Sequence, residues 1–326
     1  MLVYACCLHA AIVSSIALLN VLGPERWWGA GVNMFVPQWI WGAPSLALLP
    51  LSVSYARRWM WLPAGSLLLV AGPLMGFCWS AQRGAEGVPL RVMTYNVQLW
   101  QRQNVSEVVA EIRTTHPDIL FLQDARAGTR TVLDNFLSDW NVASFGQYVI
   151  ASKFPIFDSA PGDISYDGDT HTYLHARINV AGQYVLVSTA HFATPRDALS
   201  GYRSPKFWAG RVPFIKEDLS HRIIQARRLA DDLRHEQEPV IVAGDLNSPP
   251  PSLAIRTLTD VGLADAFSAG GRGYGYTYGH TLLYRQSFLR LDHILVSRHF
   301  TTAACSIGGT SGSDHRPVVA DLVLAR

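Results

Sequence analysis

The first 80 residues contain almost no charged side chains, and this feature restricts the chain more than any other. Their formal charges are Glu25, Arg26, Arg57 and Arg58. Three of the 27 basic residues and one of the 25 acidic residues lie there, which leaves 24 of each in residues 81–326. The two parts therefore suit different surroundings. We expect a transmembrane helical region at 1–80, a short polar linker at 81–89 and a water-exposed folded domain at 90–326.

The first part contains three apolar runs that are long enough to cross a membrane. Leu2–Leu22, Met34–Val53 and Trp59–Trp79 each have about twenty residues, the length that a helix needs to span the ~30 Å hydrocarbon core. Seven of the ten tryptophans lie in this part, close to the ends of the runs, as interfacial anchors do. A signal peptide is the alternative for the first run, but it lacks a basic n-region and two further runs follow it. A buried helical hairpin is a second alternative. We predict about three transmembrane helices.

The side of the membrane follows from the basic residues beside the runs. Arg57 and Arg58 lie between the second and third runs, and short basic loops stay in the cytoplasm. This arrangement predicts an integral protein of the inner or plasma membrane whose folded domain is extracytoplasmic. Arg83, Arg91 and Arg102 follow the third run and favour the opposite side.

The folded domain alternates strand-like and helix-like segments. Its expected helices are 105–115, 131–140, 220–236 and 252–261, where apolar residues recur with helical spacing. The expected strands are 90–97, 118–123, 147–152, 173–180, 183–191 and 239–244, with the last two in LRLDHILVS and RPVVADLVL. Strands interspersed with amphipathic helices indicate an α+β domain of mixed sheets flanked by helices.

Eight polar residues lie at the ends of these strand-like runs or inside them, and they are the candidate site. In GDLNSPP, for example, an aspartate and an asparagine end the apolar run PVIVAG before three prolines. If the strand ends meet at one edge of a sandwich, the eight side chains come together. They are Asn96, Asp124, His191, Asp245, Asn247, Asp292, Asp314 and His315.

These residue types suit metal-assisted attack of water on a phosphoester. The carboxylates of Asp124, Asp245 and Asp314 are hard oxygen ligands of the kind that Mg²⁺ or Mn²⁺ prefers. Asn96 and Asn247 add amide groups that hold a metal or a phosphoryl oxygen. His315 can serve as a general base or as a hydrogen-bond donor to the developing oxyanion, with Asp292 fixing its tautomer. His191 supplies a second imidazole for the phosphate.

Each candidate also has a purely structural interpretation. Asp245 and Asn247 could cap the helix that follows them. Asp314 and His315 could form a surface turn, and His191 could be a hydrogen-bonded histidine at a strand end. Asp292 is harder to explain in this way, because an unpaired charge within an apolar strand is costly.

The order of these motifs resembles the endonuclease/exonuclease/phosphatase superfamily, which has the deoxyribonuclease-I-like fold. The matching segments span nearly all of residues 90–324, and they are TYNV, PDILFLQD, SKFPI, STAHF, GDLNS, RLDHILVS and SDHRPVVADL. The resemblance implies a four-layer α/β/β/α sandwich and divalent-metal-dependent hydrolysis of a phosphoester. Membrane-anchored members of the family are the most similar subgroup.

The resemblance also implies a role for each of the eight residues. Asn96, Asp124 and Asp314 correspond to metal-site residues. Asp245 and Asn247 correspond to the pair that orients the nucleophile and the phosphate. His315 with Asp292 corresponds to the acid–imidazole pair, and His191 to the histidine that contacts the phosphate. Asp124 departs from the pattern, since the family usually has glutamate there, which leaves open both a weaker metal site and a pseudoenzyme.

The substrate stays open between three alternatives. A nucleic-acid enzyme should carry a basic surface, but residues 81–326 are neutral overall and contain three lysines, Lys153, Lys206 and Lys216. The segment 194–216 mixes basic and aromatic residues, which suits stacking on bases or docking on lipid. The family favours a phosphodiesterase or endonuclease-like activity on nucleic acid. A lipid phosphodiesterase or phosphatase acting on a headgroup, and a non-catalytic membrane binding protein, are the alternatives.

Overall fold

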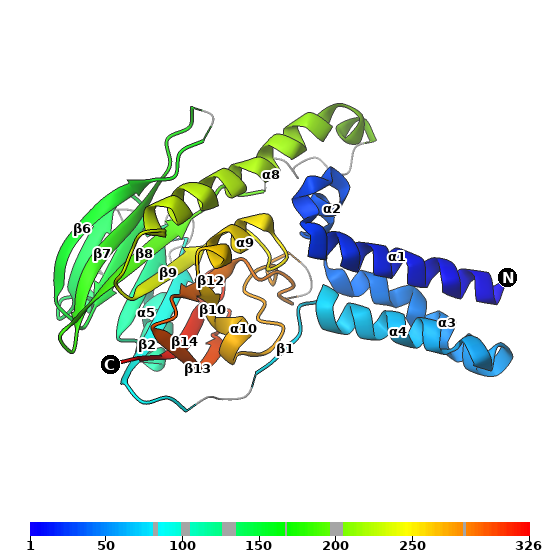
Figure 1. Ribbon diagram of the computed structural model, residues 1–326, viewed down its shortest axis with the longest axis horizontal. Coiled ribbons are helices and arrows are strands. Elements are labelled where there is room, and N and C mark those ends of the chain that lie inside the picture. The colour runs from blue at the N-terminus through cyan, green and yellow to red at the C-terminus, as the bar shows by residue number, and fades with distance from the viewer. Residues whose placement is uncertain (81–83, 99–104, 126–134, 167, 196–204, 283–284) are drawn as a thin grey trace.

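Two six-stranded sheets form the centre of the computed structural model, which describes all residues except 81–83, 99–104, 126–134, 167, 196–204 and 283–284, and the side chains of 205–211 (Figure 1). The strands of the first sheet, in spatial order, are β10 (Ala264–Asp265), β12 (Asp292–Val296), β9 (Val240–Asp245), β8 (Gln183–His191), β7 (Thr172–Val180) and β6 (Ile156–Asp163). Those of the second sheet are β13 (Phe300–Ile307), β14 (Val318–Leu324), β2 (Val88–Asn96), β3 (Ile119–Gln123), β5 (Tyr148–Ser152) and β4 (Asn141–Phe145).

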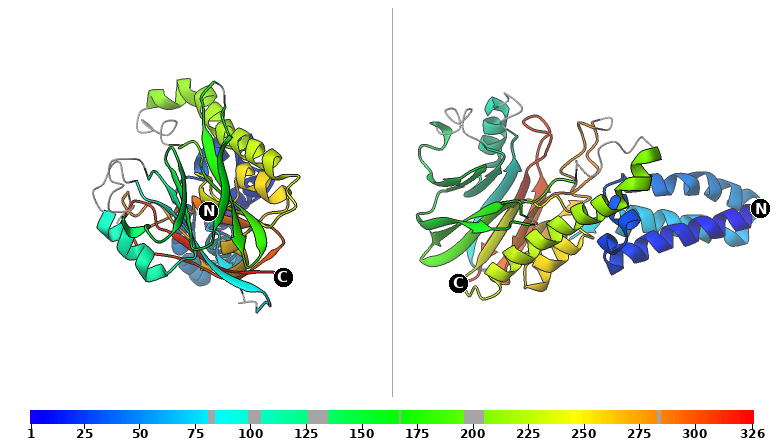
Figure 2. Two further views of the ribbon diagram at one scale, coloured as in Figure 1. Left: turned by 90° about the vertical axis from the view of Figure 1, so that its left-hand side faces the viewer. Right: turned by 90° about the horizontal axis from the view of Figure 1, so that it is seen from above.

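The apolar residues of these strands fill three cores and create four layers. The inner faces of both sheets pack against each other, with Ile119, Phe121, Ile178 and Ile241 among the fully buried residues. A second core lies between the first sheet and helices α8 (Pro205–Leu233) and α9 (Leu253–Asp260). A third lies between the second sheet and α5 (Val105–Thr115). The expected order of helices, sheet, sheet and helices is therefore present (Figure 2).

Two parallel strand pairs set the direction of the strands that matter for the site. β2 pairs with β3 and β8 pairs with β9 in parallel, and each pair is joined by a crossover that contains a helix, α5 or α8. The carboxyl ends of parallel neighbours lie at the same edge of a sheet. β12 and β14 run antiparallel to β9 and β2, so their first residues reach that same edge.

Most sequence-predicted elements are present, with differences at the sheet edges. The helix predicted over 105–115 has those bounds, whereas the one predicted over 220–236 is the C-terminal part of the longer α8. Strands β4, β6 and β13 were not predicted. For the helix predicted over 131–140, residues 131–134 lie outside the described residues, and the rest ends in a turn after residue 136.

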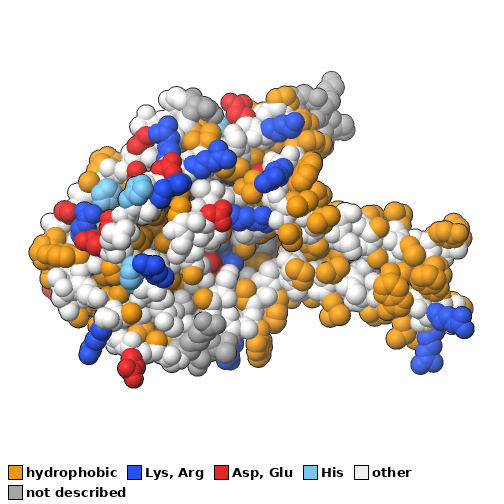
Figure 3. Space-filling view, in the orientation of Figure 1, with side chains coloured by type: hydrophobic (Ala, Val, Ile, Leu, Met, Phe, Trp, Pro, Cys, Tyr) orange, Lys and Arg blue, Asp and Glu red, His pale blue; other side chains and the backbone are white. Residues whose placement is uncertain are grey.

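The N-terminal region is a helical bundle that projects from one end of the sandwich (Figures 1 and 2). It comprises α1 (Leu2–Leu22), α3 (Ala43–Tyr55) and α4 (Trp61–Leu69), with the π-helical turn η4 (Val70–Leu74). Val13, Val70 and Leu74 form its small core. Large apolar side chains such as Leu8, Leu46 and Leu68 are exposed around it. Figure 3 shows hydrophobic side chains, in orange, spread over the surface of the bundle.

The prediction of three full membrane spans was wrong for the second and third runs. Among the described residues, α1 is the one helix long and apolar enough to cross a membrane, with a mean hydropathy of 2.2. Within 34–53 the first nine residues form turns and a 3-10 segment, so α3 has 13 residues and begins beside Pro44. Within 59–79, α4 has nine residues, and a π-helical turn containing Pro73 ends the helix. In the third run, Pro73 lacks the amide hydrogen that a continuous helix requires. In the second run the helix starts late, with Pro44 in its first turn, where proline is tolerated.

The bundle is joined to the sandwich by reciprocal contacts between helix ends. The Glu25 carboxylate, just after α1, accepts hydrogen bonds from Ser252 Oγ and from the Leu253 amide 2.9 Å away, at the start of α9. In return, Arg256 of α9 donates to the carbonyls of Asn20 and Val21 at the end of α1. An acidic group at one helix N-terminus and a basic group at the other C-terminus both match the helix dipole.

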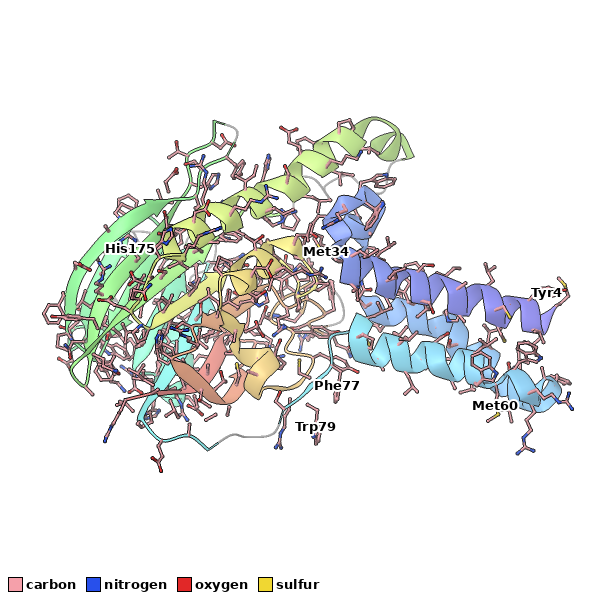
Figure 4. The ribbon with its side chains drawn as sticks, viewed as in Figure 1. Tyr4, Met34, Met60, Phe77, Trp79 and His175 are labelled. Atoms are coloured by element: carbon pink, nitrogen blue, oxygen red, sulfur yellow. The ribbon has the colours of Figure 1, made fainter. Side chains whose placement is uncertain are left out.

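A second part of the junction is apolar. Met34 and Phe35, which follow α2 (Trp28–Asn33), pack with Ile215 and Leu219 of α8 and with Leu289 and Leu291. Figure 4 shows Met34 at the point where the bundle meets the sandwich, with Phe77 and Trp79 at the same end of the bundle. Strand β1 (Cys78–Trp79) completes the junction by pairing with β11 (Arg272–Gly273). Val88 and Pro89, expected in the linker, belong to β2.

Candidate active site

Four of the eight predicted residues end or begin a strand at one edge of the sandwich, and two more lie within three residues of a strand end there, as the strand directions require. Asn96, His191 and Asp245 are the last residues of β2, β8 and β9, and Asp292 is the first residue of β12, where it pairs with Asp245. Asp124 follows β3 directly, and His315 precedes β14 by three residues. Residues separated by more than two hundred positions therefore meet at one edge.

The carboxylate of Asp245 is the centre of the cluster. Its Oδ2 accepts a hydrogen bond of 2.9 Å from Asn96 Nδ2 and lies 3.4 Å from His191 Nε2 and 3.6 Å from His315 Nε2. Its Oδ1 accepts a bond of 3.0 Å from the backbone amide of Asn247. The residue is 1 % exposed, so these partners fix the carboxylate in one orientation.

Close backbone packing holds Asp245 in place. A Cβ atom at Gly244 would lie 2.0 Å from the carbonyl oxygen of Ala190 on the neighbouring strand β8. Only glycine allows the two strands to approach this closely. Asn247 then adopts a left-handed conformation with φ 45°, and its Nδ2 donates to the Phe192 carbonyl at 2.9 Å. The turn after Asp245 is thus tied to the end of β8.

His315 and Asp292 form a buried acid–imidazole pair. Asp292 Oδ2 lies 2.8 Å from His315 Nδ1, and both side chains are almost fully buried. Burial alone lowers the pKa of His315, but the nearby carboxylates of Asp292 and Asp245 raise the pKa to about 10. Burial raises the pKa of Asp292, and His315 offsets part of that rise. With no cation bound, His315 is therefore an imidazolium at neutral pH, with Nδ1 donating to Asp292 and Nε2 directed towards Asp245.

His191 is held on the other side of Asp245. Its Nδ1 is 3.0 Å from Gln147 Oε1 and 3.8 Å from Asp124 Oδ1. Gln147 therefore favours the tautomer with hydrogen on Nδ1, which leaves Nε2 facing Asp245. Asp124 has a left-handed backbone with φ 52° and is 8 % exposed, so it lies at the edge of the cluster.

Asp314 is buried next to His315 but is not joined to the centre of the cluster. Among the described residues, its carboxylate has one hydrogen-bond neighbour, Ser313 Oγ at 3.5 Å. Ser313 Oγ also donates to the Asn96 carbonyl at 2.8 Å. The serine thus links the loop that carries Asp314 and His315 to the end of β2.

The residues present fit a divalent cation. Asp245, Asp292 and His315 each offer a ligand atom, and these atoms lie within 4.8 Å of one another. Asp292 Oδ1 is buried without a hydrogen-bond partner in the described part of the chain, which is costly unless a cation or water binds it. This group differs from the predicted metal residues Asn96, Asp124 and Asp314, of which Asn96 contacts Asp245 directly.

Sequence reasoning missed several residues that support the site. Thr277 Oγ1 accepts hydrogen bonds from the amides of Leu291 and Asp292, at 3.1 Å and 3.3 Å. The Tyr278 ring lies 4.8 Å from the His315 ring, centroid to centroid. Both belong to the glycine- and tyrosine-rich segment 270–280, whose composition marks it as a turn-rich loop but says nothing of its position. Gln147 follows a glycine with φ 57° in the β4–β5 turn, and this turn was unrecognised because β4 was not predicted.

Comparisons with known proteins agree with this geometry. The sequence profile of the Endonuclease/Exonuclease/phosphatase family matches residues 93–315, more than half of the chain, and the chain belongs to this family. No curated protein matches the sequence. Solved structures of the same fold match at low identity, so they show the fold alone.

Three of these structures illustrate the similarity. Truncated TDP2 from Caenorhabditis elegans is 18 % identical, with a TM-score of 0.58, over 72 % of this chain and 98 % of that one. An endonuclease/exonuclease/phosphatase from Bacteroides vulgatus is 18 % identical, with a TM-score of 0.57, over 73 % and 99 %. D. rerio TDP2 complexed with a single-strand DNA product is 16 % identical, with a TM-score of 0.54, over 72 % and 98 %.

Proposed function

We propose that this chain is a membrane-associated, divalent-metal-dependent phosphoester hydrolase that acts on a phosphodiester. The observation that carries the proposal is the buried Asp245 carboxylate, held between two imidazoles and an amide, beside a second carboxylate with an unpartnered oxygen. The arrangement offers an acceptor for a water proton, donors for a phosphate and ligands for a cation within one small volume.

We assign the chemical roles as follows. Asp245 orients the attacking water and accepts its proton, with Asn96 and the Asn247 amide holding the carboxylate in position. The His315 imidazolium donates from Nε2 to a phosphoryl oxygen and stabilises the charge that develops there, while Asp292 keeps the ring charged and oriented. His191 lies on the opposite side of Asp245, where its ring would contact the phosphate.

Asp245 and Asp292, with Asp124 at the edge, are the oxygen ligands that would hold Mg²⁺ or Mn²⁺. When bound, the ion would neutralise phosphate charge and polarise the phosphorus–oxygen bond. Asp124 is one methylene shorter than the family's usual glutamate, so we expect it to contact the ion from further away. We assign Asp314 a supporting electrostatic role.

The membrane part of the proposal rests on the bundle. Helix α1 has 21 residues, so it is about 31 Å long, the thickness of a bilayer core. At its far end lie Tyr4 and Met60, and at its near end Phe77 and Trp79 (Figure 4). All four side chains are at least 40 % exposed. Exposed apolar and aromatic side chains at both ends of an apolar bundle suit the two interfaces of a membrane. The basic pair Arg57–Arg58 lies at the far end of the bundle, and basic short loops stay in the cytoplasm. We therefore propose that the folded domain is extracytoplasmic.

A lipid phosphoester is a second candidate substrate, and the position of the site favours it. The loop after Asp245 and Asn247 leads within five residues to Ser252, which Glu25 binds just beyond α1. The site edge of the sandwich therefore faces the bundle end rather than the opposite end of the molecule. The DNA product in the D. rerio structure and the family's nucleases support the first candidate.

Hydrolysis of bis(4-nitrophenyl) phosphate by the detergent-purified full chain tests the proposal. We expect metal-dependent turnover that falls about 10²–10³-fold in His315→Ala, the usual cost of losing one donor to the transition state. His235→Ala, at an exposed position after α8, is the matched control and should retain full activity. Activity that is unaffected by chelation, or equal in both variants, would refute the proposed mechanism, and absence of activity would leave a binding protein.

The two substrates are separated by a panel of single-stranded DNA, double-stranded DNA and phospholipid vesicles. Release of nucleotides without release of lipid headgroups would establish the nuclease assignment. The reverse profile would establish the lipid assignment.

A further inference from the structure

A cavity of about 850 Å³ lies at the junction between the bundle and the sandwich. Trp39 and Met75 line it from the bundle, and residues of the 270–288 segment, of β13 and Arg316 line it from the sandwich. None of the eight candidate site residues lines it. Its volume lies within the range of small-molecule binding sites.

The charge of the cavity wall is positive. Arg272, Arg285 and Arg316 line it, and the described residues of the wall include no aspartate or glutamate. Arg316 is half-buried and, within the described chain, donates one hydrogen bond, from Nε to the Gly308 carbonyl at 2.9 Å. Its two terminal nitrogens donate no hydrogen bond within the described chain, and planar guanidinium groups suit phosphate. The nearby Glu111 carboxylate interacts electrostatically with this guanidinium and offsets part of its charge. Ser287 Oγ, also in the wall, is buried with no partner among the residues described.

The other part of the wall is aromatic and joins the cavity to the bundle. The rings of Tyr274 and Tyr276 stack at 5.3 Å, and Phe77 meets Tyr274 edge-on at 5.4 Å. Tyr276 donates from its hydroxyl to the Met75 carbonyl at 2.9 Å, which fixes the cavity wall to the end of the bundle. The Arg272 guanidinium lies over the Trp79 ring, 5.4 Å from its centroid.

The position of the cavity relative to the membrane follows from the lining residues that the bundle contributes. Trp39 belongs to the 3-10 segment before α3, and Met75 follows η4 directly, so both lie at the end of the bundle where α1 meets the sandwich. If α1 crosses a bilayer, this end is at the level of the lipid headgroups. A positive and aromatic cavity at that level presents cations to a phosphate and apolar surface to acyl chains.

We propose that this cavity binds an anionic phospholipid of the surrounding membrane as a ligand that is not hydrolysed. In this proposal the lipid phosphate lies between Arg272 and Arg316, near Ser287. The parts of the acyl chains closest to the headgroup pack along Trp39 and Met75 towards the bundle. The inference rests on the membrane association proposed above, but it requires no hydrolytic activity.

Native mass spectrometry of the full chain tests the inference. The protein in detergent is offered equimolar phosphatidylglycerol and phosphatidylcholine, and in a separate arm inorganic phosphate alone. We expect phosphatidylglycerol to be retained preferentially, and Arg272→Gln to reduce that preference about five-fold. Arg298→Gln, an exposed position outside the cavity, is the matched control and should bind like the parent chain.

A second variant tests the cavity itself without altering charge. Ser287→Phe places a ring in the cavity and should lower lipid retention while leaving the three arginines in place. His315→Ala should bind lipid like the parent, so loss of activity and loss of lipid binding are separate results. Equal retention of both lipids, an unchanged preference in Arg272→Gln, unchanged lipid retention in Ser287→Phe, or binding of phosphate without lipid would each overturn the inference.

Discussion

Replacing Asp292 with asparagine should alter both the rate and its dependence on pH. The change keeps the size of the side chain but removes the charge 2.8 Å from His315 Nδ1. Asp292 is the strongest of the groups that raise the His315 pKa from 6.5 to about 10. Without it, burial lowers the pKa again, and we expect a value near or below 6.5.

The expected rate follows from that pKa. At pH 8 the parent ring is charged and the variant ring is neutral, so the variant lacks its cationic donor. We expect kcat to fall about 10²–10³-fold.

The sign of the pH effect is fixed by the raised pKa. In the parent chain, activity that depends on the imidazolium is complete below the folded-state pKa and is lost as pH rises through it. In Asp292→Asn this loss should occur near pH 6.5 or below. Rates of aryl phosphodiester hydrolysis at saturating metal, measured between pH 5 and pH 10.5, give the pH at which the parent chain and the variant each lose activity. Because a bound cation also lowers the His315 pKa, both profiles are compared at one metal concentration.

Asp321→Asn is the matched control, because Asp321 is exposed and pairs with Arg91 far from the site. Its profile should equal that of the parent. An unchanged alkaline limit in Asp292→Asn would refute the assignment of His315 as a charged donor held by Asp292.

Three further predictions concern stability and metal preference. The Asp265 carboxylate is buried 2.7 Å from the Arg290 guanidinium. Burial raises the pKa of Asp265, but Arg290 and His293 lower it by more, so the pKa lies well below the usual range. Asp265→Asn should therefore lower the free energy of unfolding by about 3–5 kcal/mol, measured by urea denaturation. The depressed pKa also means that this stabilisation is complete above about pH 4 and is lost as pH falls further, which acid titration of the parent chain measures. Gly244→Ala should cost at least about 2 kcal/mol, because its Cβ would overlap the Ala190 carbonyl, and thermal unfolding should show a lower midpoint. Asp124→Glu should change the relative activities with Mg²⁺, Mn²⁺ and Ca²⁺, and identical profiles would remove Asp124 from the metal site.

The strands that carry the site were predictable because both of their signals are local. The segments around Asn96, His191 and Asp245 combine an apolar run with a polar end. A continuous apolar run of this length indicates a strand that is buried on both faces, so these strands were recognised from the sequence. Helix α5 was predicted with correct bounds because its buried residues recur with helical spacing. The convergence of the strand ends then followed from the resemblance to a family.

The edge strands were not predictable from the same signals. In β4 one of five residues is buried, and β6 is almost entirely exposed, so neither shows an apolar alternation. The contact between Gln147 and His191 joins residues 44 positions apart through a turn that only the sheet places. Composition also overestimated the membrane spans, since it counts apolar residues and takes no account of the late start of α3 at Ala43 or of the break near Pro73.

The paired bonds of Glu25 and Arg256 have a consequence for how far the site reaches. A hydrolase joined to its anchor by a flexible linker would reach substrates at many distances from the membrane surface. Here the end of the first helix is fastened to a helix that begins a few residues after Asn247, so rotation and lift are both restricted. With that first helix embedded in lipid, the active site would stay at a fixed distance from the membrane surface. Substrates would then be selected first by how far their phosphoester extends from the bilayer.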